Sequence, residues 1–252
     1  SNLYLTIDAR YNYEAYKALG GKAGTVAVYN YKTGEILCLV SAPSYDPLNV
    51  PSDIETNDRY KGAYLNRFLS STFTPGSVYK TVTLTAAIEK IPDLFERTWT
   101  CGGSVQIGEE TIVCSGTHGE QNIGDAFANS CNVAFAQIAQ ELGEETLETY
   151  TREAGLVQKS YDVDGLPTAK GTFDFSGITP GQLGSAGSGQ YPDQENPAAL
   201  LVYMGAVANG GRAAQPYLIE KTTSALGIPS LPRLSHKTGT LISPSTASVL
   251  AE

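Results

Sequence analysis

A continuous apolar pattern with helical character begins at Ser77 and ends near Lys90. Its apolar side chains fall on every side of a helix, at Val78, Val82, Leu84, Ala86, Ala87 and Ile88. A helix that is apolar all round is expected to be buried. Pro75 and Gly76 interrupt the chain before it, and Ser77 and Lys80 share one face of its first turn. The pattern therefore predicts a buried helix whose beginning carries a hydroxyl and an amine.

Alternating and turn-forming residues predict strands near both ends of the chain and helices between them. Residues 25–31 and 35–41 are predicted as two strands of a hairpin joined by Lys32-Thr33-Gly34. Further strands are expected over residues 3–7 and 217–221. Helices are expected over residues 9–19, 122–128, 133–142, 144–155 and 197–208, with another start at Ser243-Pro244. Residues 165–189 are rich in glycine, serine and proline, and the length of this loop favours function over packing.

Together these elements predict an α+β fold. We expect an antiparallel sheet flanked by helices, with a mostly helical lobe inserted into it. The 252 residues are enough for a full core, and we interpret residues 1–252 as one domain.

Composition and charge exclude several classes of function. The net charge is −9 and no cluster of Lys and Arg occurs, so we expect no nucleic-acid partner. The longest apolar runs are far shorter than a membrane span. Because the chain opens inside a strand-like segment, we expect an excised domain whose anchor lies upstream.

The four cysteines, Cys38, Cys101, Cys114 and Cys131, lack any C-x-x-C spacing, and the chain has two histidines. We therefore expect no zinc site, and no metal or other cofactor. Cys101 and Cys114 flank a short glycine-rich segment and could form a disulfide outside the cytoplasm. Four free thiols are the alternative, and the sequence leaves both open.

Ser77 and Lys80 are the first candidates for chemistry. A serine hydroxyl becomes a nucleophile when a neighbouring base takes its proton, and burial favours the free amine that a lysine base requires. The helix N-terminus adds N–H groups that could hold an oxyanion. The alternative is that Ser77 only caps the helix while Lys80 extends to solvent.

Two further motifs follow along the chain. Ser130 and Asn132 stand in a break between two predicted helices, where a hydroxyl could relay a proton and an amide could hold a substrate carbonyl. Alternatively, Asn132 is simply the N-cap of the second helix. Lys237 and Thr238, within Lys237-Thr238-Gly239-Thr240, could bind a carboxylate from a strand.

In this order, S-x-x-K, S-x-N and K-T-G are the set found in active-site serine enzymes that recognise penicillin. The chain resembles the transpeptidase domain of class B (monofunctional) penicillin-binding proteins, most of all the penicillin-binding protein A group. Segments outside the motifs resemble the family in the same order: Leu5-Thr6-Ile7-Asp8, Ser44-Tyr45-Asp46-Pro47, Asn66-Arg67, Phe127-Ala128-Asn129 and Ala208-Asn209-Gly210-Gly211.

The resemblance implies a β-lactamase/transpeptidase-like fold and a peptidoglycan D,D-transpeptidase. Ser77 would attack the D-Ala-D-Ala carbonyl of a stem peptide, Lys80 would be its base, and the backbone N–H of Ser77 would form half of the oxyanion hole. Ser130 would relay a proton and Asn132 would position the substrate. The implied partners are stem peptides, β-lactam antibiotics and a membrane glycan polymerase, at the extracytoplasmic face of the bacterial cell membrane.

The C-terminal part departs from the family order. Ser243-Pro244-Ser245 resembles a helix start that in the family precedes the Lys-Thr-Gly strand, yet here it follows Lys237-Thr238-Gly239. Either that tripeptide is a loop coincidence and the domain is incomplete at its C-terminal end, or the order differs in this chain. Lys237 and Thr238 are substrate-binding candidates only in the second case.

Two other functions stay open on the same scaffold. One is a D,D-carboxypeptidase or β-lactamase, in which water replaces the acceptor amine. No Glu-x-x-Leu-Asn segment lies between Asn132 and Lys237, which counts against a class A β-lactamase. The other is a β-lactam sensor without enzymatic activity.

Overall fold

The structure is a computed structural model that describes residues 1–191, 193–231 and 233–252. The chain folds into two compact units and passes between them several times. Unit 1 contains Ser1–Thr72, Ser160–Lys170 and Asn196–Thr240. Unit 2 contains Phe73–Lys159, Gly171–Glu195 and Leu241–Glu252. The interpretation as a single domain stays a prediction.

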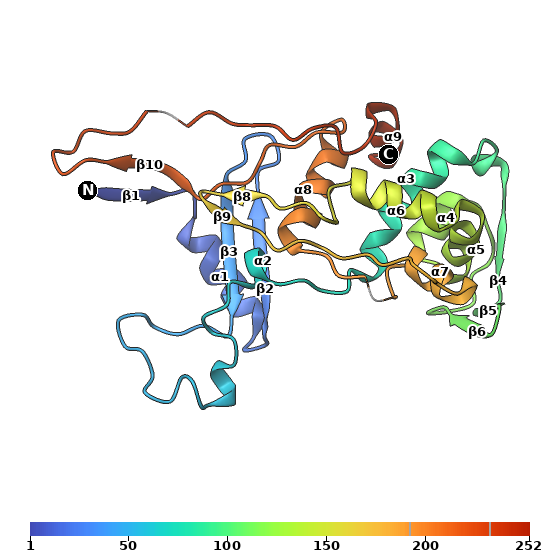
Figure 1. The fold of residues 1–252 in the computed structure, drawn as a ribbon, viewed down its shortest axis with the longest axis horizontal. Helices are drawn as coiled ribbons and strands as arrows, with labels where there is room; N and C mark the ends of the chain where they lie inside the picture. Colours follow the sequence, from blue (N-terminus) through green and yellow to red (C-terminus); the bar gives the residue numbers. More distant parts are fainter. Residues whose placement is uncertain (192, 232) are drawn as a thin grey trace. The chain divides into compact units, whose positions relative to one another are not determined.

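Unit 1 carries the predicted antiparallel strands (Figure 1). The hairpin forms as expected from β2 (Gly24–Tyr29) and β3 (Ile36–Ala42). The strand β1 (Asn2–Leu5) pairs antiparallel with β10 (Ile219–Thr223), although the two come from opposite ends of the chain. A short ladder joins β8 (Asp162–Val163) to β9 (Leu166–Pro167). Alternate side chains of β3 are buried, so one face of this hairpin contributes to the core of unit 1.

The helices of unit 1 begin and end at the signals seen in the sequence. In α1 (Ala9–Leu19), the Asp8 side chain accepts a hydrogen bond from the Arg10 N–H, and Gly20 ends the helix in the left-handed conformation. Asn196 caps α8 (Pro197–Ala208) and also donates to three carbonyl groups of the segment around α2 (Arg67–Ser70). A 3₁₀ turn spans Asp58–Tyr60.

Unit 2 is mostly helical. The buried helix predicted from the apolar pattern is α3 (Lys80–Lys90), which follows a 3₁₀ turn over Gly76–Tyr79. It packs against three other helices, and every residue from Lys80 to Ala87 is buried. The other helices are α4 (Ile123–Ala128), α5 (Asn132–Leu142), α6 (Glu144–Glu153), α7 (Pro180–Gly187) and α9 (Pro244–Leu250), with a 3₁₀ turn at Leu94–Glu96.

Short strands complete unit 2. The strand β4 (Trp99–Cys101) pairs with β7 (Gly119–Gln121), and β5 (Ser104–Ile107) pairs with β6 (Glu110–Val113). The sequence predicted a loop over residues 165–189. This prediction is wrong for the second half of the segment, where α7 forms. A Thr179–Gln182 capping box, with Pro180 at the first position, starts that helix.

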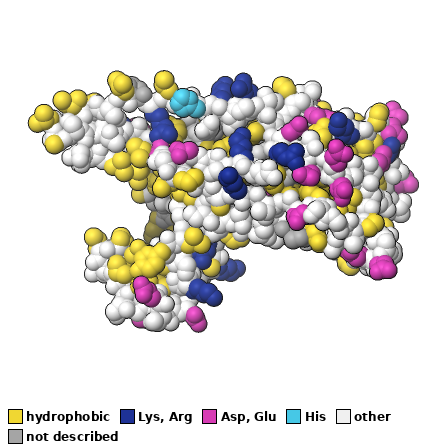
Figure 2. Space-filling model, in the orientation of Figure 1, with side chains coloured by type: hydrophobic (Ala, Val, Ile, Leu, Met, Phe, Trp, Pro, Cys, Tyr) yellow, Lys and Arg dark blue, Asp and Glu magenta, His cyan; other side chains and the backbone are white. Residues whose placement is uncertain are grey.

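The acidic surplus of the chain belongs to unit 2, which holds 16 of the 26 acidic residues and 5 of the 17 basic ones. Figure 2 shows acidic side chains grouped on the surface of this unit. The resulting negative field repels polyanions. Within the described ranges, no helix combines the length and hydropathy needed to cross a membrane.

Candidate active site

Ser77 lies in an exposed, tightly held turn that precedes α3. Gly76 adopts a φ of +64°, which places Ser77 in the 3₁₀ turn that runs into the helix. The N–H of Gly76 donates to the carbonyl of Gly189 at 2.9 Å. A Cβ atom on Gly189 would lie 2.1 Å from the Gly76 oxygen, so only glycine permits this approach. The turn is thereby fixed against the segment that follows α7, while the hydroxyl stays accessible.

Lys80 is buried directly beneath this turn, with 1% of its surface exposed. Its Nζ lies 3.0 Å from Ser77 Oγ and 3.0 Å from Ser130 Oγ. The Ser130 carbonyl oxygen lies 3.1 Å away and Asn132 Oδ1 lies 2.7 Å away. The structure therefore brings all four residues of the first two motifs together around one nitrogen. The alternative in which Lys80 extends to solvent is wrong.

The four neighbours of Lys80 suit a neutral amine. The carbonyl oxygens of Ser130 and Asn132 can only accept, so they take the two N–H groups of a free amine. Its lone pair is then left for a hydroxyl proton, from Ser77 or from the side chain of Ser130. Burial lowers the pKa of Lys80 to about 8, although negative charge on Cys114 or Cys131 would raise it. A pKa of about 8 leaves part of this amine uncharged near neutral pH.

The break between α4 and α5 positions Ser130 and Asn132. Ser130 adopts a φ of +50°, an uncommon conformation for a residue other than glycine. The N-cap of α5 is Cys131, so the alternative that assigned the cap to Asn132 is wrong. Asn132 instead turns its amide inward and donates from Nδ2 to the Val113 carbonyl at 2.9 Å. This bond orients the amide so that its oxygen faces Lys80.

Lys237 and Thr238 lie in unit 1. The expected strand does not form there, because Lys237 makes only an isolated bridge with Ala214. The Thr238 hydroxyl is buried, donates to the Gly239 carbonyl and accepts from the Ala213 N–H. These local bonds occupy the Thr238 hydroxyl, whereas Lys237 is exposed. The substrate-binding role of both residues stays a prediction.

The sequence left a disulfide and four free thiols open, and the structure has the free thiols. All four are free thiols, so the disulfide considered between Cys101 and Cys114 is not formed. Cys101, Cys114 and Cys131 nevertheless gather with His118 into a group that could hold a metal ion. The expectation of no zinc site rested on the absence of C-x-x-C spacing, and the fold brings these residues together without that spacing. Within the described residues, no second group of this kind occurs.

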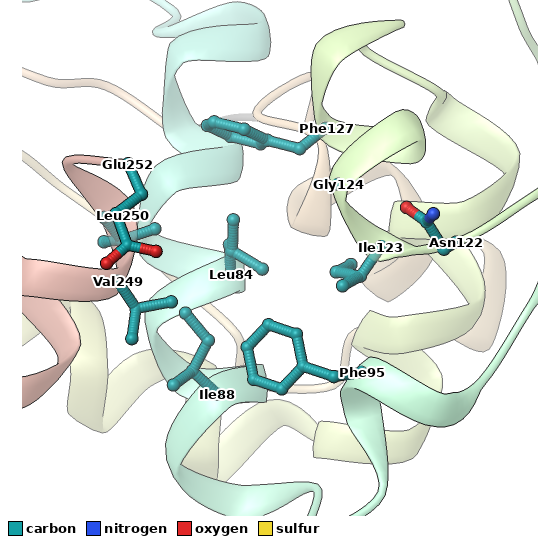
Figure 3. Close-up of a pocket in the computed structure, with 10 residues that line it drawn as sticks. All are labelled: Leu84, Ile88, Phe95, Asn122, Ile123, Gly124, Phe127, Val249, Leu250 and Glu252. Carbon is teal, nitrogen blue, oxygen red and sulfur yellow. The ribbon is translucent and has the colours of Figure 1, made fainter.

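An apolar pocket of about 520 Å³ lies elsewhere in unit 2 (Figure 3). Leu84 and Ile88 of α3 face it from one side, and Val249 and Leu250 of α9 face it from another. The described residues that line it include no serine, cysteine or lysine. Its lining is mostly apolar, with Asn122 and Glu252 as the polar side chains, and it includes none of the candidate residues Ser77, Lys80, Ser130 and Asn132.

A protein-family model, the penicillin binding protein transpeptidase domain, matches residues 24–251. The chain belongs to this family. Among curated proteins, peptidoglycan D,D-transpeptidase PbpA of Mycobacterium tuberculosis is 28% identical over the whole chain, which covers 55% of that protein. Stage V sporulation protein D of Bacillus subtilis is 31% identical over 79% of the chain and 30% of its own length. The chain thus spans about half, or less, of these relatives.

Solved structures share the fold. The D,D-transpeptidase domain of a peptidoglycan glycosyltransferase from Eggerthella lenta has a TM-score of 0.86 and 26% identity, over 97% of this chain and 63% of that one. PBPA from M. tuberculosis has a TM-score of 0.87 and 24% identity, over 99% of this chain and 62% of that one. The predicted α+β, β-lactamase/transpeptidase-like fold is therefore confirmed, as is the resemblance to the penicillin-binding protein A group.

Proposed function

We propose that this chain is the acyl-transfer domain of a peptidoglycan D,D-transpeptidase, with Ser77 as the nucleophile and Lys80 as its base. The observation that carries the proposal is the buried Lys80 nitrogen at 3.0 Å from both Ser77 Oγ and Ser130 Oγ. A related PBPA from M. tuberculosis has been solved as penicillin G, imipenem and ceftriaxone acyl-enzyme complexes, which supports a covalent intermediate here.

The geometry suggests a sequence of proton transfers. Ser77 Oγ attacks the carbonyl carbon of the penultimate D-Ala as its proton passes to the free amine of Lys80. The bond to the terminal D-Ala breaks, and Ser130 relays a proton to the departing amine. An amine from a neighbouring stem peptide then attacks the ester on Ser77, forms the cross-link and restores the hydroxyl. Asn132 holds Lys80 and offers its amide to the substrate backbone.

Electrostatic stabilisation of the tetrahedral intermediate falls to backbone N–H groups. Ser77 stands in the turn that leads into α3, where N–H groups lack partners within the helix. We assign half of the oxyanion hole to the Ser77 N–H, as the family resemblance implies. Lys237 and Thr238 would add substrate contacts only if Lys237-Thr238-Gly239 is the true third motif.

The decisive experiment is covalent labelling with a fluorescent penicillin, followed by intact mass and peptide mapping. We expect one adduct per chain, located on Ser77 and lasting many minutes. Ser77→Ala should abolish it, while Ser104→Ala, a matched change on an exposed strand of the same unit, should not. Labelling of the Ser77→Ala protein would refute the choice of nucleophile. A folded wild-type protein without any adduct would refute the acylating function.

A second assay separates the transpeptidase from its alternatives. The chain is incubated with a stem-peptide analogue ending in D-Ala-D-Ala and an excess of a D-amino acid as acceptor. A product that has lost one D-Ala and gained the acceptor supports transpeptidation, whereas a product that has only lost D-Ala indicates a carboxypeptidase. Rapid recovery of free protein from the penicillin adduct would indicate a β-lactamase, and a stable adduct without turnover of the peptide would indicate a sensor.

We further propose that the chain works outside the cytoplasmic membrane of a bacterium, anchored by an upstream segment and beside a glycan polymerase. The family resemblance supports this placement. A pull-down from membranes with the full-length protein, comparing wild type with a version that lacks the anchor, would test both parts.

A further inference from the structure

Three cysteines and one histidine that lie far apart in the sequence meet in unit 2. The ligand atoms of Cys101, Cys114, His118 and Cys131 all lie within 4.8 Å of one another. The three cysteines are buried and His118 is partly exposed. Three short elements build the group: β4 ends at Cys101, the connection from β6 to β7 carries the middle pair, and Cys131 caps α5.

The distances fit ligands that share a tetrahedral centre. Cys114 Sγ lies 3.9 Å from Cys131 Sγ and 3.7 Å from His118 Nδ1. Zinc at about 2.3 Å from sulfur and about 2.0 Å from nitrogen places two sulfurs about 3.8 Å apart, and sulfur and nitrogen about 3.5 Å apart. A disulfide would need about 2.05 Å between the sulfurs. These two spacings lie within about 0.2 Å of those around a bridging ion and well beyond a covalent bond, and all ligand atoms of the group lie within 4.8 Å of one another.

Backbone N–H groups are already directed at the sulfurs. The Asn132 N–H donates to Cys114 Sγ at 3.3 Å, and the Ala134 N–H donates to Cys131 Sγ at 3.5 Å. Such donors to sulfur favour the thiolate that binds metals, and N–H groups of this kind commonly surround metal-bound sulfur.

We propose that Cys101, Cys114, His118 and Cys131 form a structural zinc site. Three thiolates and one imidazole are soft and borderline ligands that favour zinc in tetrahedral geometry, and four protein ligands leave no open position for substrate. The proposal rests on this cluster alone and does not depend on the proposed acyl-transfer function.

The zinc site would fix the geometry of the candidate active site. Cys131 stands between Ser130 and Asn132, the two residues that hold Lys80. Cys114 follows Val113, and the Val113 carbonyl accepts a hydrogen bond from the side-chain amide of Asn132. The sulfur of Cys114 accepts a hydrogen bond from the backbone N–H of Asn132. One ion would therefore tie together the two segments that determine the orientation of Asn132. Its role is to position these residues, because a zinc ion with four protein ligands has no position left for a reacting group.

The test is the metal content of the chain purified under reducing conditions without chelators. Elemental analysis and native mass spectrometry should give one zinc ion per chain. Cys131→Ser and Cys101→Ser should weaken zinc binding by at least about 100-fold. Cys38→Ala is the matched control, because Cys38 is equally buried but lies in unit 1, outside the cluster, so this variant should keep its zinc.

A second measurement covers the case in which the variants fail to fold. The wild-type chain, freed of zinc, is titrated with Co²⁺, which should give thiolate charge-transfer bands and the strong visible bands of tetrahedral cobalt. Removing zinc should also lower the melting temperature, and zinc addition should restore it. Wild-type protein with no zinc and no tetrahedral cobalt spectrum would overturn the proposal. So would a disulfide among Cys101, Cys114 and Cys131, found by peptide mapping without reduction.

Discussion

The rate at which the chain is acylated by penicillin should depend on pH through Lys80. Burial lowers the pKa of this amine from 10.5 to about 8. The free-amine fraction then rises from about a tenth at pH 7 to about nine tenths at pH 9. Because only the free amine can take the Ser77 proton, the acylation rate should rise about tenfold over this interval and level off above it.

The size of the rise distinguishes this base from an ordinary lysine. An unperturbed lysine would give about a hundredfold rise over the same interval, with no levelling below pH 10. The two titratable groups that act on Lys80 are Cys114 and Cys131, which would both raise its pKa as thiolates. Bound zinc would neutralise much of that charge, so the profile should be measured with and without zinc.

The assay is the second-order rate constant for benzylpenicillin, followed by intact mass between pH 6.5 and 9.5. Penicillin carries only a carboxylate that does not titrate in this range, and the melting temperature at each pH confirms that the chain is folded. Asn132→Asp places a carboxylate where Oδ1 now lies, 2.7 Å from the amine, and should move the midpoint upward by about 1 unit or more.

Lys80→Arg supplies the negative control, since a guanidinium stays protonated throughout the range. We expect it to slow acylation by about 10²- to 10⁴-fold. A flat wild-type profile, or a Lys80→Arg protein that reacts within a few-fold of wild type, would refute the assignment of Lys80 as the base.

Three further predictions concern the surroundings of the site. Gly189→Ala should slow acylation by more than about tenfold, because the new Cβ would collide with the Gly76 carbonyl. The control is Gly177→Ala, where a φ of +69° gives the same backbone strain but the space is open, so this variant should react normally. Equal effects of the two variants would exclude the collision as the cause. Glu89 accepts hydrogen bonds from three hydroxyl groups at 2.7 Å, and although burial raises its pKa, these bonds outweigh burial and lower it. Glu89→Gln should therefore lower the unfolding free energy by about 1–3 kcal/mol at pH 7. The difference in unfolding free energy between wild type and variant should shrink as pH falls through the lowered pKa, because Glu89 of the wild type becomes protonated there. A difference in urea unfolding that is the same at pH 3 and pH 7 would contradict this. Lys237→Ala should change penicillin acylation by less than about twofold if the tripeptide is a loop coincidence, and a tenfold loss would instead identify it as the third motif.

The sequence predicted the elements whose signals are local. Asp8 and Gly20 mark the ends of α1 as expected, because capping depends on residues within one turn. The apolar pattern from Ser77 onward correctly predicted a buried helix, and the three-residue spacing to Lys80 placed both side chains on one face. The strand predicted over residues 3–7 forms as β1 (Asn2–Leu5), which pairs only with β10, and its Leu3 and Leu5 side chains are exposed.

The features that the sequence did not predict depend on contacts between distant segments. The sequence analysis predicted no helix at α7 because this segment is rich in glycine. The helix is stable because Leu183 and the small residues beside it pack closely on α5. Gly189 belongs to no sequence motif, and its requirement for glycine comes from the close approach of the Gly76 carbonyl, which is distant in the sequence. The cysteine group likewise needed the pairing of β4 with β7 to bring Cys101 beside His118. None of these contacts has a fixed spacing along the chain.

The burial of Lys80 gives a physical reason to regard the cluster as functional. A pKa lowered from 10.5 to about 8 corresponds to about 3 kcal/mol that the folded chain loses whenever this amine is charged. Since the folded pKa is the lower one, this loss is complete below pH 8 and disappears as pH rises toward 10.5. A leucine or methionine would fill the same space without that cost. The four oxygen contacts offset part of it, yet they require Ser130 to hold a left-handed conformation. The burial of the Lys80 amine and the left-handed conformation of Ser130 are both unfavourable for stability. Such costs are expected around a catalytic base and not around a residue that only fills the core.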